Sequence, residues 1–211
     1  MHLHSNLPEI IKEVAVGLDS EITGGASSSS APEKFRDLVP STGGGGTSFG
    51  LRSIGVAGRH RGRPVSVSLH RGSEMKIIIH CSSPCRFRIV RNTLGARLNI
   101  LGGRRIHFGI SMIDVEYVAR NSGSCDLSTF LQRSDIAAFI DFFRPFYSIS
   151  GMPGTVRSIS NFSANTLKAG EVMAKLERSI EFAGMLEEAF ADETAMAEIE
   201  KDGANREEGL E

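Results

Sequence analysis

Two cysteines and a histidine stand close together in the middle of the chain, where thiolates could bind a soft metal ion or form a disulfide. His80 and Cys81 are followed by a Ser-Ser-Pro segment and then by Cys85. Zinc sites built from thiolates usually pair two such clusters, so a metal site here would have to recruit Cys125 or His107 through the fold. We therefore interpret Cys81 and Cys85 as structural cysteines, with a metal site or a disulfide between these two as the alternatives.

Two carboxylates, Asp114 and Glu116, are the next candidates for chemistry. They lie two residues apart on what the alternation of Ile113, Val115 and Tyr117 predicts to be a strand, so they would share one face. Paired carboxylates can bind a hard cation or divide acid and base roles, but no third acid is near in sequence. A solvated strand face is the simpler interpretation.

Arginines form the largest group of residues that could bind a ligand. The guanidinium group presents a planar fork of donors that matches phosphate and carboxylate oxygens. Interleaved aromatic residues for stacking nucleobases are few. The sequence predicts a basic patch on the strand-rich part of the chain, with these members: Arg59, Arg61, Arg63, Arg86, Arg88, Arg104 and Arg105.

The charge of the chain is segregated, although the net charge is only −1. Residues 51–120 carry 13 Lys or Arg against three Asp or Glu, whereas residues 164–211 carry five against 13. Such asymmetry is typical of proteins with a basic binding face or with internal charge complementarity. The acidic segment could cover the basic one within the molecule or in a dimer, or the basic face could bind an anionic partner.

The motifs of common enzyme classes are missing. The glycines at 43–46 have no following Lys of a phosphate-binding loop, and Gly55, Gly58 and Gly62 lie between strands instead of before a helix. Neither a G-x-S-x-G nor an H-E-x-x-H motif is present. The sequence favours a protein that is not an enzyme and predicts no cofactor.

The elements that must position these residues follow from hydrophobic spacing. One short helix is predicted near Ile10 to Leu18, followed by flexible segments rich in Gly and Ser up to residue 50. Alternating or continuous apolar runs then predict short strands. They lie near residues 65–69, 75–79, 87–89, 98–100, 106–108 and 113–117, and a hairpin near 147–160.

Helices are predicted in the second half of the chain. Asp126 can cap a turn that contains Leu127, and Ser134 can cap a helix that Pro145 ends. The clearest pattern runs from about Thr166 to Phe190, where the apolar residues form one stripe. The stripe consists of Val172, Leu176, Ile180, Ala183, Leu186 and Phe190.

These elements predict an α+β fold. An antiparallel β-meander would pack against the long C-terminal helix and a short helical pair, with a flexible N-terminal arm. We expect residues 1–50 to form that arm with one short helix, residues 51–190 to form a single domain, and residues 191–211 to be an acidic, disordered tail. A cavity between the sheet and the last helix would be a special case of this arrangement.

The segment Gly58-Arg59-His60-Arg61-Gly62-Arg63-Pro64-Val65 resembles the opening of uncharacterised bacterial domains that begin with a G-x-x-x-G-R-x-V strand pair. The order of the later elements and the closing helix are also similar. The resemblance covers about residues 51–190. It implies a single domain and brings no catalytic residue with it.

The predicted location is the cytoplasm. No apolar run approaches the length that spans a bilayer, and the first residues lack the pattern of a secretory signal. Three cysteines, an odd number, argue against an obligate disulfide framework.

The function that the sequence favours is a non-catalytic binding or interaction domain that engages an anionic partner, such as nucleic acid or an anionic surface, through a basic sheet face. In that hypothesis the acidic tail imitates the partner. One alternative is a small-ligand carrier or enzyme with a pocket between sheet and last helix, using His80, His107, Tyr117 and the Asp114–Glu116 pair. The other is a structural homo-oligomer or protein-partner subunit.

Overall fold

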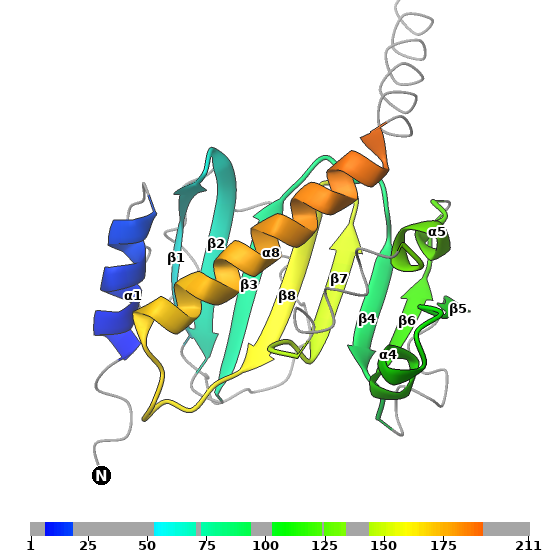
Figure 1. Cartoon of the computed structure of the whole chain (residues 1–211). Helices are drawn as coiled ribbons and strands as arrows, with labels where there is room; N and C mark the ends of the chain where they lie inside the picture. Colours follow the sequence, from blue (N-terminus) through cyan, green and yellow to red (C-terminus); the bar gives the residue numbers. More distant parts are fainter. Residues whose placement is uncertain are drawn as a thin grey trace, which may run out of the picture.

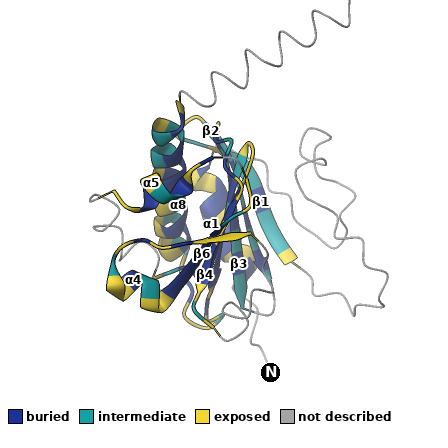
Figure 2. Ribbon diagram, turned by 90° about the vertical axis from the view of Figure 1, so that its right-hand side faces the viewer, coloured by how far each residue is buried: buried dark blue, intermediate teal, exposed yellow. Residues whose placement is uncertain are grey.

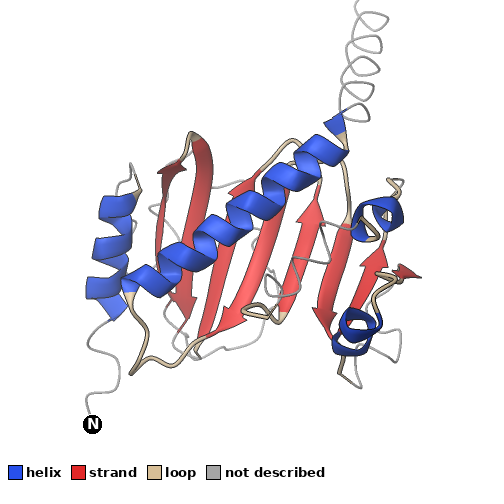
Figure 3. Ribbon diagram, in the orientation of Figure 1, coloured by secondary structure: helices blue, strands red, loops and turns tan. Residues whose placement is uncertain are grey.

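A computed structural model of the chain describes residues 7–18, 53–70, 73–93, 103–123, 125–133 and 144–191. Within these ranges the chain forms one eight-stranded antiparallel sheet with a long helix lying diagonally across it (Figures 1 and 3). The strand order is β1-β2-β3-β8-β7-β4-β6-β5. The predicted α+β fold with a long C-terminal helix is confirmed.

The strands are β1 (Ser53–His60), β2 (Arg63–His70), β3 (Glu74–His80), β4 (Phe87–Arg91), β5 (Arg104–Ile106), β6 (Tyr117–Asn121), β7 (Ser148–Met152) and β8 (Thr155–Asn161). The helices are α1 (Leu7–Gly17), α4 (Ser111–Glu116), α5 (Leu127–Leu131) and α8 (Ala169–Ala189). The predicted strand at 98–100, the predicted helix at 134–143 and the predicted tail lie outside the described residues.

A tight turn connects β1 and β2. Arg61 and Gly62 are its two central residues, and both have positive φ, 50° and 77°. Two-residue hairpin loops of this kind match the right-handed twist of the strands they join. The turn fixes a register in which His60 lies opposite Arg63, and this pairing directs both side chains toward α8.

The sheet is antiparallel throughout, but it is not a simple meander. The hairpin of β7 and β8 is inserted between β3 and β4, so that β8 pairs with β3 and β7 pairs with β4. This insertion joins two strand groups into one sheet. It also decides which side chains of distant segments become neighbours.

The core lies between the sheet and α8. The predicted stripe of the last helix is buried, and it packs on alternate residues of the central strands, such as Ile77 and Ile89. Phe182 of α8 makes edge-on ring contacts with Phe87 of β4 and Phe130 of α5, at centroid distances of 6.1 and 5.9 Å. The helix itself begins at Ala169 and ends at Ala189, slightly inside the predicted limits.

Helix α1 is part of this core. Its buried residues Leu7, Ile10, Ile11 and Val14 belong to the same cluster as the sheet and α8. The helix lies beside β1 and the beginning of α8 (Figure 1). The predicted N-terminal helix is therefore present, but it is packed against the core and is not a free arm.

One predicted strand is wrong. Asp114 and Glu116 lie on the short helix α4, and the strand begins only at Tyr117. Ile113 is buried while Val115 is 69% exposed, because residues two apart lie on opposite sides of a helix. The predicted cap at Asp126 is confirmed, since its carboxylate accepts a hydrogen bond from the Ser128 N–H.

Candidate anion-binding face

The sheet has two faces with different cover. In β2 and β3, alternate residues point under α8 and are buried, whereas their neighbours point to the other side and are half-buried. Further along the sheet, some residues of that other side, such as Val118 and Arg120, are also buried. Among the described helices, α8, α4 and α5 lie on one side of the sheet (Figure 2). None of the described helices covers the other side, which includes Ser66, Ile78, Ser150, Arg88 and Arg105, and in this sense we call it the helix-free face.

Four arginines lie in one line across the helix-free face. Arg157 of β8 is opposite Ser150 of β7, and Ser150 is opposite Arg88 of β4. Arg88 is in turn opposite Arg120 of β6, and Arg120 is opposite Arg105 of β5. Adjacent strands are about 4.8 Å apart, so this arginine row extends over about 19 Å across five strands.

The strands carry almost no negative charge to balance the row. Glu74 is the only acidic residue in the eight described strands. Its carboxylate already accepts a hydrogen bond of 2.6 Å from the hydroxyl of Tyr147. Burial, this hydrogen bond and the charge of Glu74 raise the pKa of Tyr147 to about 12, against the opposing effect of Arg157 and Arg88.

Lys76 adds a further positive charge to the same face. Its neighbour across the strand pair, Ile159, is two residues from Arg157. Burial, and after it the charge of Arg157, lower the pKa of Lys76 below its usual range. The basic groups of this face therefore affect one another.

The row is poorly supplied with internal partners. Within the described residues, neither an acidic side chain nor a hydrogen-bond acceptor pairs with Arg88, Arg105 or Arg157. The Nε of Arg157 is buried and has no acceptor there. Arg120 is buried and donates to the carbonyl of Gly103 at 3.1 Å. Arg88 and Arg105 are exposed, so these two guanidinium groups can receive an anion.

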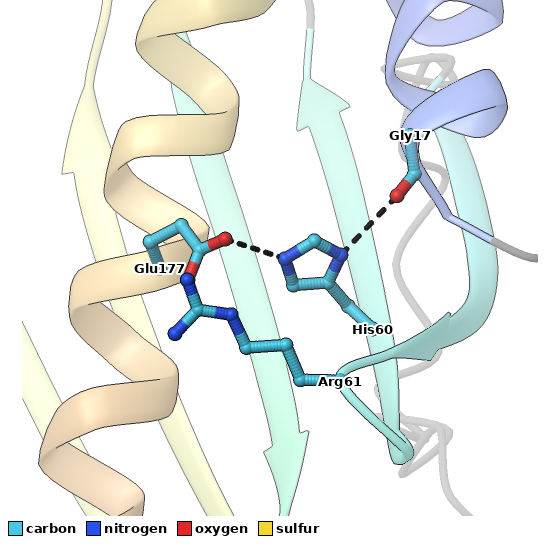
Figure 4. A network of polar contacts seen from close by, with 4 residues as sticks. All are labelled: Gly17, His60, Arg61 and Glu177. Carbon is cyan, nitrogen blue, oxygen red and sulfur yellow. Dashed lines mark hydrogen bonds and ion pairs between the residues drawn. The ribbon is translucent and has the colours of Figure 1, made fainter.

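The first part of the predicted patch lies on the α8 side. The turn between β1 and β2 presents His60, Arg61 and Arg63 to the helix. His60 Nε2 lies 2.6 Å from Glu177, and Arg61 pairs with the same carboxylate at 3.0 Å (Figure 4). His60 Nδ1 lies 3.2 Å from the carbonyl oxygen of Gly17, the last residue of α1. This network fastens α1 and the hairpin to α8.

A second acidic residue of α8, Glu187, also binds an arginine of this hairpin. Glu187 pairs with Arg63 and accepts a hydrogen bond of 2.7 Å from the N–H of Ser82. Burial alone would raise the pKa of Glu187, but Arg63 and the Ser82 N–H together hold it below its ordinary value. Arg61 and Arg63 are thus neutralised inside the molecule.

The structure therefore divides the seven predicted arginines into separate groups. Arg61 and Arg63 pair with α8, and Arg59 donates to the carbonyl of Gly62 at 3.1 Å. Arg88 and Arg105 belong to the arginine row. Arg86 precedes β4, and Arg104 borders a pocket at the edge of β5.

Sequence reasoning missed Arg120 and Arg157. Both belong to the row, but they lie on strands that are far from Arg88 in the chain. The available signal was their alternation with buried residues, Ala119 beside Arg120 and Val156 beside Arg157. That alternation gives a face only when the strand order is known.

The cysteines pair differently from the prediction. Cys85 forms a disulfide with Cys125, with a Cα–Cα distance of 5.5 Å, and Cys81 is a buried free thiol. The alternative of a disulfide between Cys81 and Cys85 was wrong, because the fold brings Cys125 beside Cys85. Burial raises the pKa of the Cys81 thiol to about 11. In the described residues, no three His, Cys, Asp or Glu side chains gather as a metal site.

The residues proposed for a catalytic pocket do not converge. His80 lies on the helix-free face, since it pairs with Thr155. His107 Nδ1 is 3.7 Å from Asp114, near α4. Tyr117 is buried, and burial is the main cause that raises its pKa.

The fold and the face together define this chain as an antiparallel α+β domain with one helix-covered and one basic sheet face. No protein-family model and no curated protein sequence matches the chain. In fold, it is similar to the crystal structure of the mycobacterial trehalose monomycolate transport factor A, TtfA, with a TM-score of 0.53. The similarity covers 86% of this chain and 95% of that chain at 10% sequence identity, so it concerns the fold alone.

None of the helices in the described part of the chain has the length and apolar character that crossing a bilayer requires.

Proposed function

We propose that this protein is a non-catalytic binding domain that engages an anionic partner through the arginine row on its helix-free face. The observation that carries the proposal is the register itself, which aligns Arg157, Arg88, Arg120 and Arg105 across five strands. Like charges directly opposite each other destabilise a sheet. An anion that bridges them removes this cost and gains charge-assisted hydrogen bonds.

The shape of the row indicates the class of partner. The row is one residue wide and about 19 Å long, so it fits the phosphate groups of a linear polymer better than a plane of lipid headgroups. Aromatic side chains for stacking are few on this face, so contacts to bases contribute little. The partner that fits best is the phosphate backbone of a nucleic acid, bound without sequence preference.

The similarity to a transport factor supports a binding role in general terms. It does not distinguish among ligands. The dispersed positions of His80, His107 and Tyr117 also favour binding over catalysis, because a catalytic constellation needs groups within hydrogen-bond reach of one another.

The experiment compares two variants of the full chain. Binding to a fluorescent single-stranded oligonucleotide and to phosphatidylserine vesicles is measured for Arg88→Gln and for Arg61→Gln. Arg61 is the matched control, because it is an exposed arginine already paired with Glu177. Arg88→Gln should weaken oligonucleotide binding severalfold and reduce the slope of log K against log salt by about one charge.

Two results would decide against the proposal, and a third would change the partner. The first is the absence of binding to either probe at low salt. The second is an equal loss of oligonucleotide affinity in both variants, which would show that the arginine row has no special role in binding. Binding to vesicles but not to the oligonucleotide would retain an anion-binding face and replace the nucleic acid by a membrane surface.

The two alternatives from the sequence have less support. Buried side chains of the core, such as Leu176 and Ile77, fill the interface between the sheet and α8, where a carrier or enzyme would need its pocket. A structural homo-oligomer stays a prediction, and sedimentation at several concentrations tests it.

A further inference from the structure

A polar pocket of about 570 Å³ lies at the edge of the sheet beside β5. It is bordered by β5, by the end of β6 and by α5. Its charged and polar lining includes Arg104, Arg105, His107, Asn121, Ser128 and Gln132. Because β5 is the last strand of the described sheet, Arg104 and Arg105 can both border the pocket although they come from opposite faces.

The one acidic side chain of the lining is already engaged. The Asp126 carboxylate accepts hydrogen bonds from the N–H and the hydroxyl of Ser128 at the start of α5. These hydrogen bonds lower the pKa of Asp126, and the charge of Arg104 lowers it slightly further. Among the described contacts, this carboxylate forms no ion pair with Arg104 or Arg105.

Among the other lining groups, His107 lies 3.7 Å from Asp114, and the two arginines are the remaining charged side chains. In the described part of the chain, Arg104 and Arg105 make no side-chain hydrogen bond or ion pair. Asn121 is used internally, since its oxygen accepts from Gly123 N–H at 3.0 Å and its nitrogen donates to the carbonyl of Cys125. The guanidinium groups of Arg104 and Arg105 therefore suit the pocket to a negatively charged ligand.

The pocket wall is held by covalent and hydrogen-bonded contacts. The disulfide between Cys85 and Cys125 ties the segment before α5 to the start of β4. Gln132, after α5, donates to the carbonyl of His107 at 3.4 Å and connects the opposite wall. A site formed before the ligand arrives binds with a smaller ordering cost.

We infer that this pocket binds a phosphorylated sugar or polyol. The phosphate group would lie between the guanidinium groups of Arg104 and Arg105, whose forks match its oxygens. The volume exceeds what a bare ion requires and lies in the usual range of small-ligand sites. Ile106 is the main apolar residue among the described lining, which has no Phe, Tyr or Trp ring to stack on a nucleobase. The Ser128 hydroxyl and the Gln132 amide already donate to Asp126 and to His107, but their oxygen atoms would accept hydrogen bonds from the hydroxyl groups of a sugar.

This inference goes beyond the proposed function, because it concerns a small ligand and a different arginine. Arg104 borders the pocket but does not belong to the arginine row, while Arg88 belongs to the row but does not border the pocket. Arg105 belongs to both and is left unchanged in the test.

The experiment is titration calorimetry of the full chain with glucose 6-phosphate, glucose and inorganic phosphate. The native protein should bind glucose 6-phosphate with a dissociation constant below about 1 mM. Glucose should not bind, and inorganic phosphate should bind at least tenfold more weakly than glucose 6-phosphate. Arg104→Gln should weaken glucose 6-phosphate binding at least tenfold, and Arg88→Gln should leave it unchanged.

Each contrary result overturns the inference. Absence of heat with glucose 6-phosphate up to about 10 mM excludes a site of useful affinity. Equal binding of inorganic phosphate leaves an ion site without a sugar subsite. If Arg104→Gln and Arg88→Gln weaken glucose 6-phosphate binding equally, the binding reflects general charge attraction and not this pocket. Oligonucleotide binding by the same variants tests the arginine row separately.

Discussion

Replacing Arg88 with Gln should stabilise the folded protein slightly while it weakens the binding of anions. Arg88 lies directly opposite Arg120 on the helix-free face, and Ser150 separates it from Arg157 on the other side. No described acidic side chain pairs with it. A residue retained for binding at a cost in stability would show this combination of effects.

The expected gain follows from the spacing of the strands. Directly opposite residues have Cβ atoms about 5 Å apart, and like charges there cost up to about 1 kcal/mol. Two unit charges about 5 Å apart in water repel by about 0.8 kcal/mol, and the long side chains reduce this by separating. Arg157 is about 10 Å away, close to the screening length at 0.1 M salt, and adds little.

We therefore expect Arg88→Gln to raise the free energy of unfolding by about 0.5 kcal/mol at low salt. For a chain of this size the midpoint of thermal unfolding would rise by about 1–2 °C. In about 0.5 M salt the gain should largely disappear, because the charges are then screened. Urea unfolding followed by circular dichroism at both salt concentrations measures the difference.

A matched variant gives the opposite sign. Arg61 pairs with Glu177 at 3.0 Å, and its side chain is 70% exposed. Arg61→Gln should therefore lower stability by up to about 1 kcal/mol at low salt, and by less at high salt. If Arg88→Gln destabilised the protein at low salt, or if its gain did not depend on salt, the repulsion between Arg88 and Arg120 would be refuted.

Three further predictions concern the core, the acid response and the disulfide. Gly151→Ala would place a Cβ 2.2 Å from the ring of the buried Phe87, so the free energy of unfolding, measured with urea, should fall by about 1–3 kcal/mol. Gly154→Ala is a poor control, because Gly154 has a positive φ although the space around its Cβ is open. The better control is Phe87→Leu in the Gly151→Ala background, which should restore part of the lost stability. The pKa of Glu187 is lowered in the folded state, so its contribution to folding stability is complete above the ordinary glutamate pKa of about 4.3 and is lost as the pH falls through the lower folded value. In Glu187→Gln, the stability measured by circular dichroism or fluorescence should therefore depend less on pH in this acidic range. An unchanged pH dependence would contradict the contacts of Glu187 with Arg63 and Ser82. Reduction of the Cys85–Cys125 disulfide opens a loop of sequence separation 40 and should cost about 4 kcal/mol, which unfolding with and without a reductant measures; a loss below about 1 kcal/mol would show that the bridge contributes little.

Local patterns were sufficient for the elements that depend on neighbours in sequence. The stripe of α8 could be predicted because its apolar residues recur at helical spacing and face one sheet. The cap at Asp126 could be predicted because a carboxylate before an apolar turn satisfies its first N–H groups. The strand at Val65 to Leu69 could be predicted from its alternation.

Features that depend on the order of strands could not be predicted. The hairpin of β7 and β8 is inserted between β3 and β4, and only this insertion aligns Arg157 with Arg88. The bond between Cys85 and Cys125 likewise depends on where two distant segments meet. At Ile113 and Tyr117, a spacing of four residues suits both a strand and a helix, and the short alternation favoured the wrong one.

The segregation of charge along the chain acquires a physical meaning once the two faces of the sheet are distinguished. Glu177 and Glu187 of α8 pair with arginines of the β1–β2 turn, so acidic groups of the C-terminal segment neutralise basic groups on the helix side. They cannot neutralise the arginine row in the same way, because the sheet lies between α8 and the helix-free face (Figure 2). Internal complementarity and external binding are therefore not rival interpretations of one basic set. They apply to different arginines, and Arg61→Gln and Arg88→Gln should separate them by the sign of their effect on stability.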